Sequence, residues 1–314
     1  MSLYSIVVPV YNSEHTLQPL YERLRDVFDQ TLSQPFELIL VDDHSRDSSW
    51  KVMQDLHHAD PRVTAIQLAR NFGQPGATLC GFSYAKGDFV ITMDDDLQHR
   101  PEALPDMISW LNGHPETDVV LASYVGRKHG PVRRLGTRFS RYMTSRMLGS
   151  PPDLDLTSFR LMRGFVKDAI LQERIYHPQI GNLILNVSDR IVNIPVQHDA
   201  RQYGKSGYTF RRLAKDLLYD ITSHSAFPMV FVRNLGLAGI LMSILLAMYY
   251  LFRYFVYGNS VEGWTTLVLL TLLGFSLVLF SLGIMGMYIV NILFQSKMLP
   301  PYVIRRAFTD KDHG

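Results

Sequence analysis

The stretch FVITMDDDLQ, residues 89–98, carries the clearest structural signal in this chain. Its first half is a short apolar run with β-branched residues, which is typical of a buried strand, and three carboxylates follow where the strand ends. Adjacent carboxylates repel one another unless solvent or a cation neutralises them. Alternate side chains of an extended run point the same way, so Asp94, Asp96 and Gln98 are expected to converge. Such oxygen ligands suit Mg²⁺ or Mn²⁺ holding a diphosphate; a solvated acidic turn is the alternative.

The residues before this stretch alternate between strand and helix patterns. We expect strands at 6–10, 36–41 and 63–68, and helices at 17–28, 47–58 and 74–85. Such alternation predicts an α/β fold with a parallel sheet and helices on both faces, in which ligands bind beyond the carboxyl ends of the strands. The second strand ends in Asp42 and Asp43, so two acidic strand ends are expected at the same edge. This pairing favours a ligand site over a solvated turn.

Composition excludes several classes of protein. The chain has 314 residues, of which 47% are hydrophobic and 19% charged, so it is not a mostly disordered or collagen-like chain. Its single cysteine, Cys80, allows no internal disulfide and no cysteine-based zinc or iron–sulfur site within one chain. The net charge of +2 gives no reason to expect nucleic-acid binding.

Residues 234–294 differ from the rest because Arg253 and Glu262 are their only charged side chains. Residues 234–252 span about 28 Å as a helix at about 1.5 Å per residue, which is enough to cross a bilayer core. Residues 264–294 are uncharged and exceed the length of one span, so a second helix there either tilts or continues along the membrane interface. We therefore predict four parts: a domain of mixed composition at 1–207, an amphipathic juxtamembrane segment at 208–232, two transmembrane helices within 233–295, and a tail at 296–314.

Basic residues gather near both ends of this apolar region and in one earlier stretch. Arg211, Arg212, Lys215 and Arg233 precede it, and Lys297, Arg305 and Arg306 follow it. By the positive-inside rule, the large domain and both termini are expected in the cytoplasm.

Residues 127–150 carry seven basic and no acidic side chains. They form either a solvated basic helix or a segment at an anionic membrane surface or substrate.

Three blocks in this order resemble the family 2 glycosyltransferases of the GT-A fold: SIVVPVYN at 5–12, VDDHSRD at 41–47 and MDDDLQHRPE at 93–102. RNFGQ at 70–74, Asp155 followed by FRL at 159–161, and the spacing of Arg201, Ser206 and Tyr208 resemble the polyprenyl-phosphate glycosyltransferases, the dolichol-phosphate-mannose-synthase-like group. The C-terminal apolar segments resemble its bacterial branch, which includes bactoprenol glucosyltransferases and undecaprenyl-phosphate formamidoarabinose transferases. The resemblance implies a Rossmann-like GT-A domain followed by a two-helix membrane hairpin.

The resemblance also implies a role for individual residues. By this resemblance, the nucleotide is bound by Pro9, Tyr11, Asp43 and Asp94, and the metal ion by Asp94, Asp96 and Gln98. The diphosphate is bound by Arg201 and Ser206, and the acceptor phosphate by Arg127 and Arg134. Asp155 matches the position of the catalytic base. Because a phosphate acceptor is already ionised at neutral pH, Asp155 is either that base or a group that positions the acceptor.

The implied reaction is inverting transfer of one sugar from a nucleotide sugar, with UDP the expected nucleotide, to undecaprenyl phosphate in the bacterial inner membrane. A separate flippase would then move the lipid-linked sugar across the membrane for envelope modification. The resemblance also implies a homotetramer. A processive polysaccharide synthase is one alternative, but the chain has no Gln-x-x-Arg-Trp block. A non-catalytic membrane scaffold of the same fold is the other, against which the intact Asp94, Asp96, Arg201 and Ser206 argue. The sequence leaves the sugar open.

Overall fold

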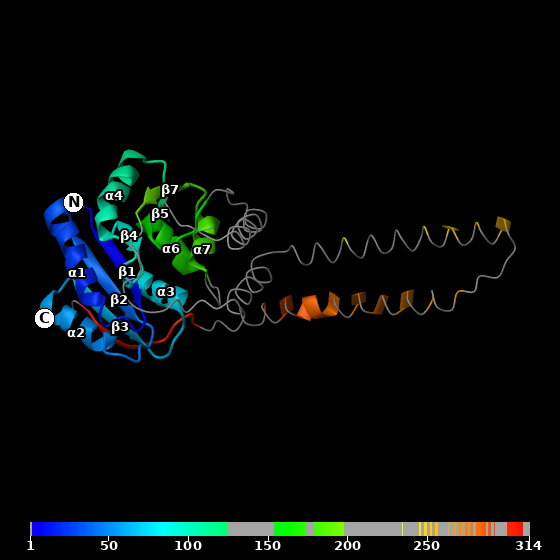
Figure 1. Cartoon of the computed structure of the whole chain (residues 1–314), viewed down its shortest axis with the longest axis horizontal. Coiled ribbons are helices and arrows are strands. Elements are labelled where there is room, and N and C mark those ends of the chain that lie inside the picture. Colours follow the sequence, from blue (N-terminus) through cyan, green and yellow to red (C-terminus); the bar gives the residue numbers. More distant parts are fainter. Residues whose placement is uncertain are drawn as a thin grey trace. The chain divides into compact units, whose positions relative to one another are not determined.

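The computed structural model of the chain describes residues 2–124, 154–173, 179–197 and 300–309, together with scattered positions between 234 and 292 (Figure 1). The chain divides into two units, of which the first combines Met1–Ser206 with Met298–Gly314 and the second is Gly207–Lys297. The first unit is therefore built from both ends of the chain.

The first part of this unit alternates strands and helices as the sequence predicts. Its elements are β1 (Tyr4–Val10), α1 (Leu17–Asp26), the π-helical turn η1 (Val27–Leu32), β2 (Phe36–Asp42), α2 (Ser49–Ala59), β3 (Val63–Leu68), α3 (Gln74–Tyr84) and β4 (Phe89–Thr92). Strands β1–β4 pair in parallel, with β1 between β2 and β4. All seven residues of β1 are buried, as expected for a β-branched strand covered on both faces.

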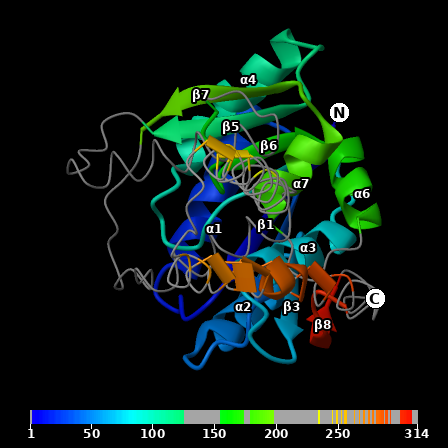
Figure 2. The ribbon, with the colours of Figure 1, turned by 90° about the vertical axis from the view of Figure 1, so that its right-hand side faces the viewer.

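The rest of the unit completes a mixed sheet. It comprises the 3-10 turn η2 (Pro101–Ala103), α4 (Leu104–Gly113), β5 (Val119–Tyr124), β6 (Arg160–Arg163), α6 (Gly164–Gln172), α7 (Ile180–Val187), β7 (Ile191–Val196) and β8 (Ile304–Phe308). The strand order is β7-β5-β6-β4-β1-β2-β3-β8, in which β6 runs antiparallel to β4 and β5, and β8 runs antiparallel to β3. Figure 2 shows β8 beside β3.

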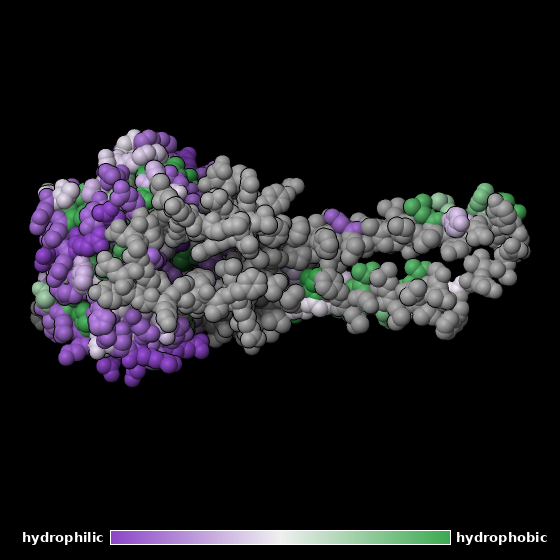
Figure 3. Space-filling view, in the orientation of Figure 1, coloured by the Kyte–Doolittle hydropathy of each residue, from purple (hydrophilic) through white to green (hydrophobic). Residues whose placement is uncertain are grey.

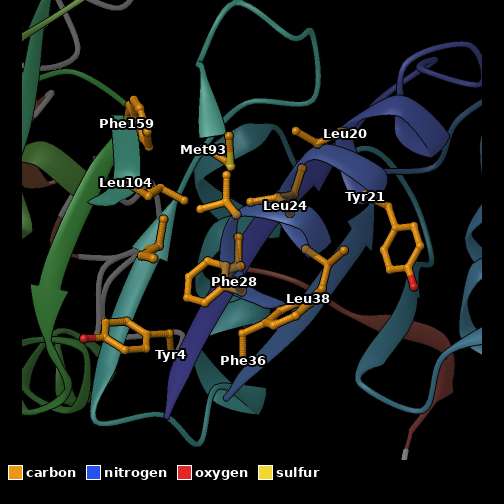
Figure 4. Packing of buried hydrophobic residues seen from close by; sticks show 14 of the residues in the cluster. Tyr4, Leu20, Tyr21, Leu24, Phe28, Phe36, Leu38, Met93, Leu104 and Phe159 are labelled. Carbon is orange, nitrogen blue, oxygen red and sulfur yellow. The ribbon is translucent and has the colours of Figure 1, made fainter. Parts of the chain in front are cut away.

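Two hydrophobic clusters cover the two faces of the sheet. Helices α1, α2 and α4 contribute to one cluster and α3, α6 and α7 to the other. In the first cluster, the Phe28 ring lies 5.0 Å from that of Phe36 and 5.6 Å from that of Tyr4 (Figure 4). On the other face, α3 approaches β1 so closely that a Cβ at Gly81 would lie 2.2 Å from Val7 Cγ1. The sheet is thus the middle of three layers.

The C-terminal strand is a finding that the sequence analysis does not predict. Residues 296–314 are treated there as a tail, whereas Ile304–Phe308 extends the sheet at its β3 edge, with Ala65 opposite Phe308. The Phe308 ring lies 5.8 Å from the rings of both Trp50 and His57 on α2. Strand β8 therefore belongs to the first unit both by pairing and by packing.

The second unit is described at scattered positions only. Within the part of the chain that the structure describes, no helix combines the length and apolarity needed to cross a membrane. Fourteen of the 19 residues in the predicted span at 234–252, and 15 of the 31 at 264–294, lie outside the described residues. The described positions there include exposed apolar side chains such as Phe255, Leu267 and Phe275, whereas hydrophilic residues dominate the described surface of the first unit (Figure 3).

Candidate functional site

A cavity of about 170 Å³ lies at the carboxyl edge of the central strands. It is lined by Pro9, Val10, Tyr11, Asp43, Gln74, Asp94, Asp95 and Asp96. These residues come from the end of β1, the residues after β2 and β4, and the start of α3. Since parallel strands present their carboxyl ends at one edge, the two acidic strand ends meet here as predicted. The cavity also gathers four predicted nucleotide-binding residues, Pro9, Tyr11, Asp43 and Asp94.

The Asp94 carboxylate is held by side chains from distant parts of the chain. Gln74 Nε2 at the start of α3 donates to Asp94 Oδ1 over 2.6 Å, and Ser158 Oγ, just before β6, donates to Asp94 Oδ2 over 2.8 Å. The backbone N–H of Asp94 donates to Nδ1 of the buried His99 over 2.9 Å. Each carboxylate oxygen has more than one lone pair, so these bonds leave acceptor capacity for a ligand.

Asp95 turns back toward the loop after β1. Its Oδ2 accepts the backbone N–H of Tyr11 over 3.0 Å and the hydroxyl of Ser13. Burial raises the pKa of Asp95 to about 6, and the neighbouring charges of Asp94 and Asp96 act in the same direction against the lowering effect of the two hydrogen bonds. Asp95 therefore connects two loops that line the cavity.

Asp43 has a similar role in another pair of loops. Its Oδ1 accepts the backbone N–H of Phe72 over 2.6 Å, and its Oδ2 accepts that of Gly73 over 2.8 Å. Burial raises the pKa of Asp43 to about 6 despite these hydrogen bonds. Asp42 points elsewhere and accepts from the backbone of Ser45 and from Gln67 Nε2, which fits a structural role.

The predicted metal ligands are partly gathered. Asp94 and Asp96 both line the cavity, and the backbone N–H of Gln98 donates to Asp96 Oδ1 over 3.1 Å. Among the residues that the structure describes, no three His, Cys, Asp or Glu side chains form a metal-binding group. A site with two carboxylates still fits Mg²⁺ or Mn²⁺, because such ions are commonly held by one or two carboxylates together with phosphate oxygens of a substrate.

Asp155 lies half-buried in the segment that leads into β6. The side chain of Asn193 on β7 forms two hydrogen bonds with the Asp155 backbone. Asp155 N–H donates to Asn193 Oδ1 over 2.7 Å, and Asn193 Nδ2 donates to the Asp155 carbonyl over 3.0 Å. Ser123 Oγ donates to Asp155 Oδ2 over 3.2 Å. Asp155 does not line the cavity, but Ser158 of the same segment contacts Asp94.

The remaining predicted site residues, Arg127, Arg134, Arg201 and Ser206, lie outside the described residues. Conversely, the structure adds supporting residues that the sequence analysis did not assign: Ser13, Gln74, His99, Ser158 and Asn193. Gln74 and His99 stand within two of the blocks quoted above, which was a usable signal. Ser158 lies between Asp155 and the FRL block at 159–161, whereas Asn193 carries no local signal, because only the sheet order brings it to Asp155.

Comparison with known proteins gives matches along nearly the whole chain. The family model described as Glycosyl transferase family 2 matches residues 5–171. The uncharacterized glycosyltransferase YkcC of Bacillus subtilis (strain 168) is 32% identical over 97% of this chain and 94% of its own length. An undecaprenyl-phosphate 4-deoxy-4-formamido-L-arabinose transferase of Proteus mirabilis (strain HI4320) is 32% identical over 96% of this chain and 93% of its own length.

Solved structures share the fold at low sequence identity. Glucosyl-3-phosphoglycerate synthase from Mycobacterium tuberculosis, in complex with Mn²⁺, UDP and glucosyl-3-phosphoglycerate, superimposes with a TM-score of 0.52 at 16% identity, covering 70% of this chain and 78% of that one. Mannosyl-3-phosphoglycerate synthase from Rubrobacter xylanophilus gives a TM-score of 0.51 at 16% identity, covering 76% and 75%. Both support the α/β architecture described above.

Proposed function

The chain belongs to glycosyl transferase family 2, and on that premise we propose that it transfers a single sugar from a nucleotide diphosphosugar to undecaprenyl phosphate. The observation that carries the proposal is the cavity that brings Asp43, Asp94 and Asp96 together beside Tyr11. The acceptor is proposed because a relative that matches nearly the whole chain at 32% identity is named an undecaprenyl-phosphate transferase.

The donor is proposed to be a UDP-sugar bound in this cavity. Tyr11 exposes 47% of its surface at the cavity wall, so its ring is available for a nucleobase. Asp43, at the opposite loop, offers carboxylate oxygens that a base N–H can share with the Phe72 and Gly73 amides. Arg201 and Ser206 are proposed to grip the diphosphate, because the Arg donors form a planar fork that matches phosphate.

Asp94 and Asp96, with Gln98, are proposed to hold Mg²⁺ or Mn²⁺. When bound, the ion supplies Lewis-acid stabilisation of the negative charge on the departing diphosphate. The chain's own contribution is to keep Asp94 oriented through Gln74 and Ser158, so that the carboxylate is preorganised before the donor arrives.

The acceptor phosphate is proposed to attack the anomeric carbon in a single displacement, which inverts its configuration. Arg127 and Arg134 are proposed to bind this phosphate, and Asp155 to position it. Asp155 suits positioning because Asn193 holds its backbone at both the N–H and the carbonyl. Most of the rate gain then comes from alignment of acceptor and donor rather than from proton abstraction.

We further propose that residues 233–295 form a transmembrane hairpin in the bacterial inner membrane, with the catalytic unit and both termini in the cytoplasm. Support comes from the nearly uncharged sequence of 234–294 and from the exposed apolar side chains described there, such as Phe255, which is 77% exposed. A product for envelope modification, a separate flippase and a homotetramer complete the proposal as predictions.

A transfer assay tests this function. The full-length protein in vesicles with undecaprenyl phosphate and Mn²⁺ is given radiolabelled UDP-glucose, UDP-galactose and an amino-arabinose nucleotide in turn. We expect one of these donors to label the lipid with a single sugar and EDTA to abolish the label. A polymeric product would support a processive synthase instead, and no label from any nucleotide sugar would contradict the proposal.

Asp96→Ala provides the matched variant for this assay. Asp96→Ala removes a carboxylate proposed to hold the ion that stabilises the diphosphate, so we expect transfer to fall at least about 100-fold. Each factor of ten corresponds to about 1.4 kcal/mol of barrier. Asp55→Ala, which removes an exposed carboxylate on α2, is the control and should keep full activity. Full activity of Asp96→Ala would remove Asp96 from the site.

A further inference from the structure

We propose that His99 is a positioning residue of the donor site, whose neutral imidazole accepts the Asp94 backbone N–H and places its Nε2 near the Asp94 carboxylate. This inference rests on the proposed function, because it assigns a role within the same cavity. This role follows neither from the family resemblance nor from the names of the relatives.

The hydrogen bonding of Asp94 determines which nitrogen of His99 carries the proton. A backbone amide can only donate, so the 2.9 Å contact from Asp94 N makes His99 Nδ1 an acceptor. An imidazole that accepts at Nδ1 is neutral and carries its proton on Nε2. That nitrogen lies 3.5 Å from Asp94 Oδ2. One side chain thus faces both the backbone and the carboxylate of the same residue.

Packing holds the imidazole in this orientation. His99 is only 3% exposed, and its ring stacks on that of Phe159 with the centroids 5.1 Å apart and the planes at 10°. Phe159 is fully buried and directly follows Ser158, whose hydroxyl donates to Asp94 Oδ2. The dipeptide before β6 therefore supports Asp94 twice, once through the Ser158 hydroxyl and once through the ring that supports His99.

These contacts predict a defined consequence for donor binding. Gln74 donates to Asp94 Oδ1 and Ser158 donates to Oδ2, while His99 Nε2 lies 3.5 Å from Oδ2, so groups on three separate segments surround the carboxylate. Without His99, the Asp94 backbone N–H loses its acceptor, and one of the groups near Asp94 Oδ2 is removed. We expect weaker nucleotide binding with little change in the overall fold.

The test distinguishes the roles of the two ring nitrogens of His99. Asn at position 99 can offer an acceptor near the Nδ1 position, whereas Gln can offer a donor near the Nε2 position. UDP affinity of the full-length protein in detergent is measured by calorimetry, without metal and with Mn²⁺. We expect His99→Asn and His99→Gln each to weaken UDP binding about tenfold, and His99→Ala to weaken it further. His114→Asn is the control, because His114 also stacks on an aromatic ring, that of Trp110, away from the cavity.

A double-mutant cycle decides whether His99 acts through Asp94. If it does, His99→Asn should have little further effect on UDP affinity in an Asp94→Asn background, whereas a merely structural role gives additive losses. The same cycle measured by urea unfolding tests the contact independently of any ligand. Additive effects in both cycles, or wild-type UDP affinity in His99→Asn, would overturn the inference. A wild-type protein that binds no nucleotide while the unfolding cycle shows coupling would instead overturn the proposed donor.

Discussion

The acidic residues at the cavity differ in what their carboxylates do, although the sequence presents them as one type of side chain. Asp43 and Asp95 accept hydrogen bonds from loops beside the cavity, and burial raises the pKa of each to about 6. Asp94 is held by the side chains of Gln74 and Ser158. Adjacent carboxylates, Asp94 and Asp95, therefore have different partners: side chains from distant segments for Asp94 and the loop after β1 for Asp95.

The first prediction at this scale concerns Asp155. The acceptor phosphate monoester has its second pKa near about 6, so above about pH 7 it needs no general base. Asp155→Asn, which removes the charge but keeps the size, should therefore lower transfer by a large factor that stays nearly constant between about pH 7 and pH 9. A pH–rate profile of the variant checks this. Recovery of the variant in step with phosphate ionisation would identify Asp155 as the base, whose loss costs about 10²–10⁴ in rate.

A second prediction follows from the raised pKa of Asp43. Its ordinary pKa is 3.8 and burial raises it to about 6, so between these values the folded state binds more protons than the unfolded state. Stability contributed by this group is therefore greatest at low pH and declines as the pH rises from about 4 to about 6. Urea unfolding at pH 4, 5, 6 and 7 should show wild type losing stability relative to Asp43→Asn in that window. If the unfolding free energies of wild type and Asp43→Asn change in parallel between pH 4 and pH 7, the prediction is contradicted.

At the scale of elements, the loop before α3 connects the cavity to the C-terminal strand. Phe72 and Gly73 donate to Asp43, and Gly73 has a φ of 82°, a conformation that suits glycine. On its other side, Ala69 N–H donates to the Val303 carbonyl over 2.8 Å. Tyr302 OH further donates to Ser83 Oγ on α3 over 3.0 Å. The residues that return into the first unit thus support a loop that shapes the cavity.

Gly76→Ala tests this connection. A Cβ at Gly76 would lie 2.9 Å from both the Pro301 carbonyl oxygen and Phe72 Cβ, so one of them has to move. We expect a loss of about 1–3 kcal/mol in the free energy of unfolding and weaker UDP binding, because Phe72 N–H contacts Asp43. Gly113→Ala is the matched control, since nothing lies within 4 Å of its Cβ position. Equal stability and equal UDP affinity of the two variants would refute the connection.

At the scale of the whole molecule, segments from both ends of the chain form the first unit. The chain leaves this unit after Ser206 and re-enters it at Met298, and β8 then covers the edge of β3. An uncovered strand edge is a template for aggregation. Any truncation that removes the proposed membrane hairpin together with the C-terminus therefore changes two things at once.

Two variants separate these effects. A chain that ends after Lys297 lacks β8 and the Phe308 contacts, and should unfold more easily and aggregate. A chain in which residues 207–297 are replaced by a long flexible Gly/Ser linker keeps β8, and should bind UDP normally but transfer poorly to undecaprenyl phosphate in vesicles. Thermal unfolding, UDP calorimetry and the lipid assay check both. Undiminished lipid transfer by the linker variant would show that the second unit is not needed to reach the acceptor.

The sequence by itself determined the α/β class, the first four strands and the edge at which Asp43 and Asp94 meet. These follow from local physics, because hydrophobic periodicity reports the type of an element and the parallel arrangement places successive carboxyl ends together. The blocks at 5–12, 41–47 and 93–102 also sufficed for the family, which the match over residues 5–171 confirms.

The partners of each carboxylate and the position of the C-terminal strand become known only from the folded structure. Ser158 is 64 residues from Asp94 and Asn193 is 38 residues from Asp155, and the hydrogen bonds within each pair form only through the order of β7, β5, β6 and β4. Strand β8 pairs with β3 across more than 230 residues of chain. The physical reason is the same in each case: a hydrogen bond between distant segments depends on which strands become neighbours, and local periodicity carries no information about that choice.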